Sequence, residues 1–216
     1  MSSNEPDTRT RILAASMKLL ESAPTKLPRM SDIAKAAGIS RQALYLHFDS
    51  RTDLLVETTR YQDHTNNADQ KLMTHRNKIR GRDKLDAFVL AWGNYIPEIW
   101  GVARALVTLS ATEPEAAAAL DQRMADVRQG FEAAIKVIDS DGDLPPALNV
   151  TLATDLVAML MSFRNWETLT QSMGWTQDCY VETMRAMAQA AVLGDMNALS
   201  TVLTCTEHLD PSGHPA

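Results

Sequence analysis

The chain has 216 residues and a formal net charge of −6, and 45% of its residues are hydrophobic. This length and apolar content are enough for a full core in one or two domains, and they exclude wholesale disorder. No apolar run approaches the ~20 residues needed to cross a bilayer, and the polar N-terminus lacks the apolar stretch of a secretory signal. The two cysteines, Cys179 and Cys205, make no disulfide framework. We therefore expect a cytoplasmic protein that does not bind membranes.

The charge is distributed unevenly along the sequence. Residues 1–82 contain 14 Lys or Arg and 9 Asp or Glu, whereas residues 83–216 contain 7 and 18. The first segment therefore has a net charge of +5 and the second a net charge of −11. A basic N-terminal third in an acidic chain favours an anionic partner for that third alone. A solvated basic face without a partner would show the same charge.

Helical patterns run from end to end of the chain, and no convincing alternating strand pattern is present, which predicts an all-α protein. Residues 8–22 have one broad apolar side, and a segment with two prolines separates them from a short helix at 30–37. A third helix follows closely. A longer fourth helix is predicted from Asp49 or Ser50 to about His75. At ~25 residues it would span roughly 37 Å and could act as a rigid lever.

The sequence changes character around residues 77–83, after which aromatic and Met residues accumulate. Pro97 predicts a break or kink in the helix that follows this change. A Pro- and Gly-containing loop separates the later helical patterns. These patterns predict helices over residues 112–138, 149–173 and 176–193.

Residues 30–48 have the pattern of a helix-turn-helix. Such a motif needs a small residue where two short helices touch, a residue tolerant of positive φ in the turn, and apolar inner faces. Ala34 and Gly38 meet the first two needs, and Ser40 can cap the helix that follows. An ordinary pair of packed helices could show the same spacing.

The outer side of this last helix carries polar groups suited to nucleic acid. Leu44 and Phe48, at positions i and i+4, point inward. Arg and Gln can make bidentate contacts with base edges, and Tyr, His and Ser can bond phosphates. The pattern predicts a recognition helix for the major groove that presents Arg41, Gln42, Tyr45 and His47.

These segments resemble the N-terminal domain of the TetR family of bacterial transcriptional regulators. The resemblance covers residues 9–55 and rests on "RILAASMKLL", "MSDIAKAAGIS" and "ALYLHFDSRTDLL" with the spacings between them. It implies that Arg41, Gln42 and Ala43 read bases and that Tyr45, His47 and Arg51 contact phosphates. The predicted DNA-binding set is Arg29, Ser31, Ser40, Arg41, Gln42, Ala43, Tyr45, His47 and Arg51.

One position departs from the family pattern. The family usually has a Thr at the start of the second helix, where it caps the helix and touches a phosphate. Here the position is Arg29, preceded by Pro28. Arg29 can still reach a phosphate but cannot cap the helix, and we expect Ser31 to add a contact.

The resemblance implies an all-α protein in two parts. An N-terminal three-helix helix-turn-helix domain is joined by the long fourth helix to a C-terminal helical domain for dimerisation and ligand binding. We place the DNA-binding domain at residues 6–66, the effector-binding and dimerisation domain at 67–205, and a disordered tail at 206–216.

The sequence of the C-terminal part also favours a homodimer. The helix predicted around residues 149–172 is apolar on more than one side, so a second buried face implies a second partner. The stretch "MRAMAQAAVLG" supplies small residues that permit close helix approach. An ordinary central core helix remains the alternative.

Aromatic and Met side chains around Pro97 suggest a cavity for a small apolar effector. A plain hydrophobic core would use the same residues, and a lone charge such as Arg104 could equally lie at the surface. The residues predicted for the pocket are Phe88, Trp92, Tyr95, Trp100, Arg104, Met159, Phe163 and Trp166.

Catalysis is not expected, because the sequence has no metal-ligand spacing, phosphate-binding glycine loop or nucleophile motif. We predict no cofactor, no metal site and no catalytic residue. The predicted function is a repressor that binds a palindromic operator in double-stranded DNA and is released by a small, largely apolar effector. The alternative is a DNA-binding protein of the same fold that has no such effector and is controlled by a protein partner.

Overall fold

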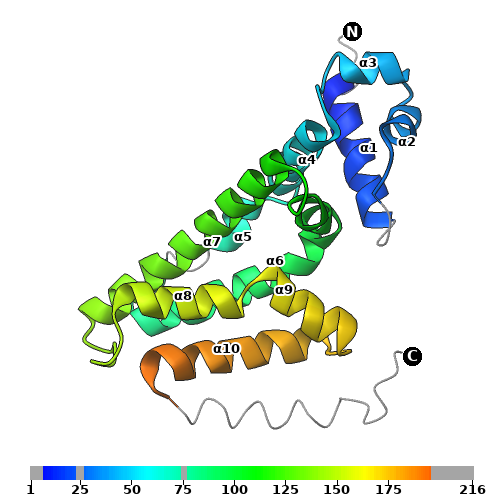
Figure 1. The fold of residues 1–216 in the computed structure, drawn as a ribbon. Coiled ribbons are helices and arrows are strands. Elements are labelled where there is room, and N and C mark those ends of the chain that lie inside the picture. Colours follow the sequence, from blue (N-terminus) through cyan, green and yellow to red (C-terminus); the bar gives the residue numbers. More distant parts are fainter. Residues whose placement is uncertain (1–6, 23–26, 74–76, 196–216) are drawn as a thin grey trace. The chain divides into compact units, whose positions relative to one another are not determined.

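The computed structural model describes residues 7–22, 27–73 and 77–195, and all regular elements in these ranges are helical (Figure 1). The predicted all-α fold class is therefore confirmed. The predicted tail at 206–216, Cys205 and His75 lie outside the described residues. The α-helices are α1 (Thr8–Ser22), α2 (Met30–Ala36), α3 (Arg41–Tyr45), α4 (Arg51–Thr65), α5 (Ala68–Leu72), α6 (Gly81–Leu109), α7 (Pro114–Ser140), α8 (Val150–Leu160), α9 (Phe163–Trp166) and α10 (Gln177–Leu193). A π-helical segment, Glu167–Ser172, follows α9.

The chain forms two compact units. Unit 1 comprises Met1–Asp69 and Pro97–Arg123, and unit 2 comprises Gln70–Ile96 and Met124–Ala216. Helices α6 and α7 therefore each contribute residues to both units. In the described part of the chain, no helix combines the length and the apolar character needed to span a membrane.

The N-terminal helices of unit 1 surround a small hydrophobic core. Helix α1 packs on α2 and α4, and α2 packs on α3. Their inner faces contribute Ile12, Ile33, Leu44, Phe48 and Leu54, each of which is at most 1% exposed. This core orients the short helix α3 on the surface of unit 1.

A second hydrophobic cluster joins the later part of α6 to α1 and α4. Leu20 and Leu55 lie in one cluster with Leu106 and its neighbours. Gly101 allows the backbones to come close, because a Cβ at this position would lie only 2.9 Å from the Cα of Glu21. Residues 97–123 are thus part of the hydrophobic core of unit 1.

Buried polar groups hold the same helices together. The Gln62 side chain is 1% exposed, and its Nε2 donates to Glu21 Oε1 and to the Glu98 carbonyl, both at 3.2 Å. Arg123 makes a bidentate ion pair with Asp63, with N–O distances of 2.6 and 2.8 Å. Because a hydrogen bond requires defined geometry, these contacts of the buried Gln62 and the partly buried Asp63 fix the position of α4 within unit 1.

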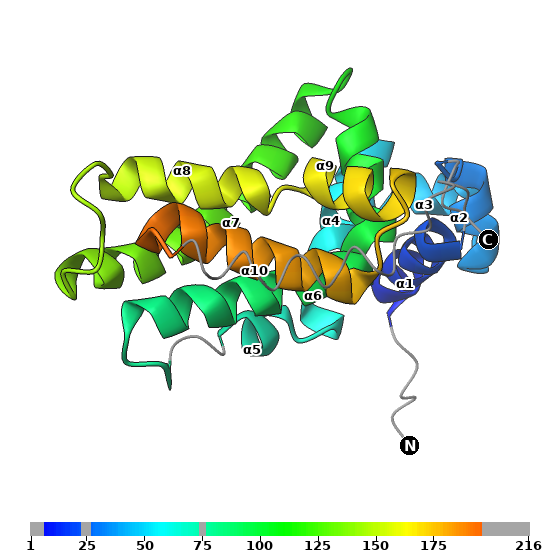
Figure 2. The ribbon, with the colours of Figure 1, turned by 90° about the horizontal axis from the view of Figure 1, so that it is seen from below.

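Unit 2 is a bundle in which α8 and α10 lie side by side (Figure 2). The rings of Phe88 and Phe131 meet edge to face with centroids 4.8 Å apart. Gly130 makes room for this pair, since a Cβ there would lie 2.3 Å from Phe88 Cζ. Asp86 accepts two hydrogen bonds from Arg185, at 2.8 and 2.7 Å, which joins α6 to α10.

The fourth helix is shorter than predicted. It ends at Thr65, and Asn67 has a φ of +52°, a left-handed conformation that interrupts the helix before α5. Asn adopts this conformation more readily than most residues. The prediction of one rigid helix from residue 51 to about 75 is therefore wrong, and with it the single-helix lever.

The sequence predicted a break or a kink at Pro97, and the structure shows that α6 continues through this residue without a break. Proline has no N–H and leaves the carbonyl four residues earlier, that of Gly93, without its usual helical donor. Gln177 Nε2 donates to this carbonyl at 2.9 Å, and Gln177 Oε1 accepts from Trp166 Nε1 at 2.9 Å. The side chain of Gln177 thus compensates for the proline, and α6 continues through it.

The helix predicted over 149–173 is instead divided. Helix α8 ends at Leu160, and Ser162 caps α9 by accepting from Asn165 N at 3.3 Å. Asn165 Nδ2 donates to the carbonyls of Met159 and Leu160, at 2.7 and 3.3 Å. Side chains at the break therefore replace the backbone bonds that a continuous helix would make.

Gln177→Leu should destabilise the protein, because it leaves the Gly93 carbonyl and the Trp166 indole N–H without their partners. We expect the free energy of unfolding to fall by about 2–4 kcal/mol, measured by urea denaturation. Gln70→Leu, at an exposed position of α5, is the control and should change it by less than about 0.5 kcal/mol. Equal effects of the two substitutions would contradict the role of Gln177.

Candidate nucleic-acid interface

The turn between α2 and α3 depends on Gly38. Its φ is +69°, a left-handed conformation that costs little only for glycine. The Ile39 amide donates to the Ala34 carbonyl at 3.0 Å across this turn. Ser40 then caps α3, its hydroxyl accepting from Ala43 N at 3.1 Å. The helix-turn-helix predicted from the sequence is therefore present.

Helix α3 has one buried and one exposed side, as predicted. Leu44 and Phe48 are 0% and 1% exposed. Arg41 and Gln42 are exposed, and the Arg41 guanidinium lies 5.6 Å from the centroid of the Tyr45 ring. Ala43 and His47 are half-buried. This side thus offers hydrogen-bond donors and acceptors in the positions that the resemblance assigns to DNA contacts.

Three arginines line a hollow beside this helix. Its volume is about 380 Å³, and its lining residues are Arg29, Met30, Ser31, Arg41, Tyr45 and Arg51. Among the described residues, no carboxylate makes an ion pair with Arg29 or Arg41. A concave surface with unneutralised guanidinium groups attracts an anion such as a phosphate.

Arg29 begins α2 without capping it, as its chemistry requires. A guanidinium has donors only, so it cannot accept a bond from the first helical amides. Instead the Asp32 carboxylate accepts from the Arg29 amide at 3.2 Å. The Arg29 side chain therefore lines the hollow while Asp32 stabilises the helix start.

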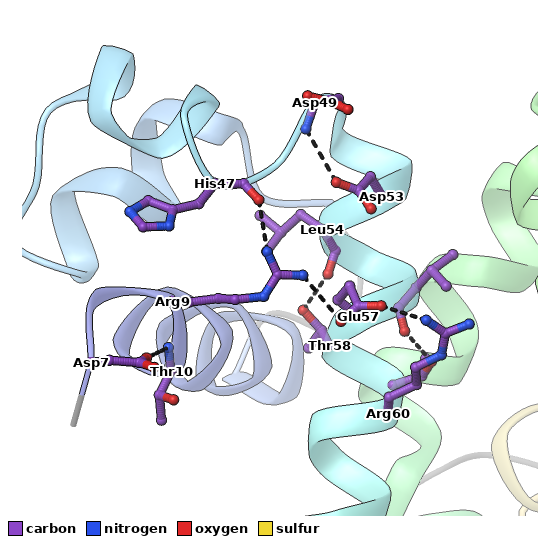
Figure 3. Close-up of polar contacts among 12 residues, drawn as sticks. Asp7, Arg9, Thr10, His47, Asp49, Asp53, Leu54, Glu57, Thr58 and Arg60 are labelled. Carbon is purple, nitrogen blue, oxygen red and sulfur yellow. Dashed lines mark hydrogen bonds and ion pairs between the residues drawn. The ribbon is translucent and has the colours of Figure 1, made fainter.

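The sequence analysis missed Arg9, which fixes the end of α3 (Figure 3). Its Nη1 donates to the His47 carbonyl at 2.9 Å, and its Nη2 makes an ion pair with Glu57 at 3.2 Å. The guanidinium also lies 4.4 Å from the centroid of the Phe48 ring. Arg9 thus joins α1, the end of α3 and α4. The sequence has no local signal for this contact, because Arg9 lies in the first turn of α1, 38 residues from His47.

Two hydrogen bonds between side chains and backbone amides stabilise the N-terminus of α4. Ser50 Oγ accepts from Asp53 N at 2.9 Å, and Asp53 Oδ2 accepts from Asp49 N at 3.1 Å. This arrangement orients the first turn of α4 and therefore Arg51, which lines the hollow.

Leu46, which the predicted set omits, is 87% exposed at the end of α3. Its exposure could not be read from its apolar character.

The residues predicted for an effector pocket are divided between the units. Trp100 and Arg104 belong to unit 1, and the others belong to unit 2. Met159 is 59% exposed and lies apart from the buried aromatic side chains. The buried members of the set are Phe88, Trp92, Tyr95, Phe163 and Trp166.

These buried aromatic side chains pack against one another. The centroid of Trp92 is 6.3 Å from that of Tyr95 and 5.5 Å from that of Phe163. Trp92 Nε1 donates to the Met161 carbonyl at 2.9 Å. The indole is therefore both packed and hydrogen-bonded within unit 2.

Two buried hydroxyls of α10 were also missed. Tyr180 and Thr183 are 0% and 3% exposed, and neither hydroxyl has a hydrogen-bond partner among the described residues. Burial raises the pKa of the Tyr180 phenol, which therefore remains protonated and able to donate. An unpaired buried hydroxyl costs about 1–3 kcal/mol, so both groups can gain from an added partner.

No metal centre is found in the part of the chain that the structure describes, where no three His, Cys, Asp or Glu side chains come together. The features that define the class of this protein are instead the helix-turn-helix, the exposed polar side of α3 and the arginine-lined hollow. Unit 1 has the architecture of a helix-turn-helix DNA-binding domain.

Comparison with known proteins identifies the family of this domain. Residues 12–58 match the sequence profile described as bacterial regulatory proteins, tetR family. The matched segment overlaps the N-terminal part that the resemblance covers, and the matched family is the one that the resemblance named. Among curated proteins, none matches this chain in sequence.

Solved structures share the fold of nearly the whole chain. A Saccharomonospora viridis protein in complex with choline has a TM-score of 0.72 and 19% identity, covering 86% of this chain and 97% of that one. FadR from Bacillus subtilis, in complex with stearoyl-CoA, has a TM-score of 0.66 and 14% identity, covering 85% and 97%. PfmR from Thermus thermophilus, a TetR family transcriptional regulator, has a TM-score of 0.63 and 21% identity, covering 87% and 97%. The chain therefore has the fold of a TetR-family transcriptional regulator.

Arg9→Ala should loosen the end of α3, because it removes the donor to the His47 carbonyl and the partner of Glu57. We expect the free energy of unfolding to fall by about 1–2 kcal/mol in urea denaturation. Arg11→Ala makes the same charge change at an exposed position of α1 and should cost less than about 0.5 kcal/mol. A loss no greater for Arg9→Ala than for Arg11→Ala would show that Arg9 has no such role.

Proposed function

We propose that the protein is a sequence-specific transcriptional regulator that represses genes by binding a palindromic operator as a homodimer in the cytoplasm. The observation that carries this proposal is the exposed side of α3 beside the arginine-lined hollow. Arg41 and Gln42 can read base edges in the major groove. Tyr45, His47 and Arg51 can hold the adjacent phosphates. No catalytic role is proposed.

The remaining predicted contacts have secondary roles in this proposal. Arg29 and Ser31 lie at the start of α2 and line the hollow with Arg51, where they can bind the same phosphate. Ser40 caps α3, so that the N-terminus of this helix can face the DNA. The small side chain of Ala43 allows close approach to a base. The DNA-binding part would comprise residues 6–66 together with 97–123, which complete the core of unit 1.

Dimerisation is proposed through the outer sides of α8 and α10. Leu152 and Met159 of α8 are 45% and 59% exposed, and Met187 of α10 is 37% exposed. Exposed apolar side chains grouped on two adjacent helices are typical of a protein interface, and Ala190 permits close approach. In this proposal Met159 serves the interface and not the effector pocket. A dimer places two recognition helices about 34–36 Å apart, so each reads one half of a palindrome.

The effector is proposed to bind in unit 2. The buried hydroxyls of Tyr180 and Thr183 support this site, since a ligand could supply the missing hydrogen bonds. The surrounding apolar side chains favour a largely apolar molecule with one or two polar atoms. Two proteins of similar fold were solved with choline and with stearoyl-CoA, so these compounds are reasonable first probes.

The packing of Trp92 against Tyr95 and Phe163 supports the alternative function, a DNA-binding protein of the same fold that has no small effector. A filled aromatic core leaves little room for an effector and favours control by a protein partner. The two proposals differ in one measurement, since only an effector stabilises the isolated dimer by mass action.

DNA recognition can be tested by selecting bound duplexes from a random library and measuring affinities of the selected operator and its single-base variants. Gln42→Ala should weaken binding to the preferred operator by roughly 1–3 kcal/mol and relax preference at one or two positions. Arg51→Ala should weaken binding to all sequences and flatten the salt dependence. If both substitutions weaken every sequence equally, Gln42 does not read bases.

The effector site can be tested with the double variant Tyr180→Phe and Thr183→Val, which removes both unpaired hydroxyls and keeps most of the volume. We expect the ligand-free protein to be at least as stable in thermal unfolding. A compound that stabilises the natural protein should lose most of its effect on this variant. By linkage, saturating operator must weaken that compound's binding by the factor by which the compound weakens operator binding. An undiminished thermal shift would place the ligand elsewhere.

A further inference from the structure

Arg51 faces two different surroundings within unit 1. On one side it lines the hollow with Arg29 and Arg41, where the proposed function places a DNA phosphate. On the other side its Nη2 lies 3.8 Å from Oε1 of Glu113. Glu113 comes from the turn between α6 and α7, far from Arg51 in the sequence.

The carboxylate of Glu113 is held in place independently of Arg51. Its Oε2 accepts a hydrogen bond from the hydroxyl of Thr52, which is 2% exposed. Glu113 also directly precedes Pro114, the first residue of α7, where the helix N-terminus favours a negative charge. Arg51 is therefore not needed to keep Glu113 where it is.

The ion pair between Arg51 and Glu113 is long and partly exposed. The two side chains are 36% and 38% exposed, and pairs of this kind contribute little to stability. An incoming phosphate can therefore draw the guanidinium away from Glu113 at small cost. The Glu113 carboxylate, fixed by Thr52, would then remain near the phosphate and repel it.

We propose that Glu113 lowers the affinity of the protein for DNA because its fixed carboxylate repels the phosphate that Arg51 binds. This inference rests on the proposed DNA-binding function. It also separates Arg51 from the other two arginines of the hollow by its carboxylate partner. Within the described ranges, Arg51 has a carboxylate partner, and no ion pair is found for Arg29 or Arg41. The phosphate contact of Arg51 is thus the one that Glu113 opposes.

The charge of Glu113 can be removed without losing its hydrogen bond. In Glu113→Gln the amide oxygen still accepts from the Thr52 hydroxyl, while the negative charge is gone. Glu115→Gln is the matched control, since Glu115 is an exposed carboxylate of the same first turn of α7. It makes the same change in net charge and in the charge near the helix N-terminus, and no contact with Arg51 is found for it.

The test measures the affinity of the full-length protein for a labelled duplex of mixed sequence and roughly 30 base pairs, which spans two half-sites. A mixed sequence suffices because phosphate contacts dominate non-specific binding. Glu113→Gln should bind roughly two- to fivefold more tightly than the natural protein at low salt, and the gain should shrink as salt is added. Glu115→Gln should bind like the natural protein.

The same measurement in an Arg51→Gln background shows whether the effect acts through Arg51. The gain from Glu113→Gln should be mostly lost there, because without the Arg51 guanidinium no phosphate is drawn to the position beside Glu113. Affinity that is unchanged or weaker in Glu113→Gln would overturn the inference. So would an equal gain in Glu115→Gln, or a full gain without Arg51. Absence of any salt-dependent duplex binding by the natural protein would instead contradict the proposed function itself, and the inference with it.

Discussion

Every interruption of a helix leaves backbone carbonyls or amides that need new partners, and this constraint decides where the helices of the protein can end. A buried carbonyl without a donor costs as much as a lost hydrogen bond. After α3 ends at Tyr45, Arg9 donates to the carbonyl of His47, two residues further along the chain. Asn165 does the same for the end of α8, and Gln177 supplies the bond that Pro97 removes from α6. The segment that follows α3 is therefore held by an arginine of another helix, Arg9 of α1.

The helix-turn-helix, which depends on contacts between residues close in the sequence, could be predicted from the sequence. Gly38, Ser40 and Leu44 act through bonds and contacts within a few residues, so their spacing indicated the helix-turn-helix and the buried side of α3. The resemblance then gave the fold of the whole chain. The predicted set of DNA contacts could be placed on this frame because each position follows directly from the register of α2, α3 and α4.

What could not be predicted depends on partners distant in the sequence. Pro97 indicated a break or a kink, but Gln177, 80 residues further along the chain, donates to the carbonyl that the proline leaves without a helical donor. The exposure of Met159 and the burial of Tyr180 likewise follow from how α8 and α10 pack, which no helical pattern specifies. Thr52 lies in α4 and Glu113 in the turn between α6 and α7, so their meeting beside Arg51 has no local signal in the sequence.

The chain passes between the two units at three points along its length, after Asp69, Ile96 and Arg123. Neither unit is therefore a continuous stretch of sequence. A fragment that stopped at residue 66 would keep the whole recognition helix yet lack the part of α6 that covers Leu20 and Leu55. Its newly bared apolar surface would favour aggregation. The hydrophobic core of unit 1 therefore needs more of the chain than residues 12–58, the segment that matches the family profile.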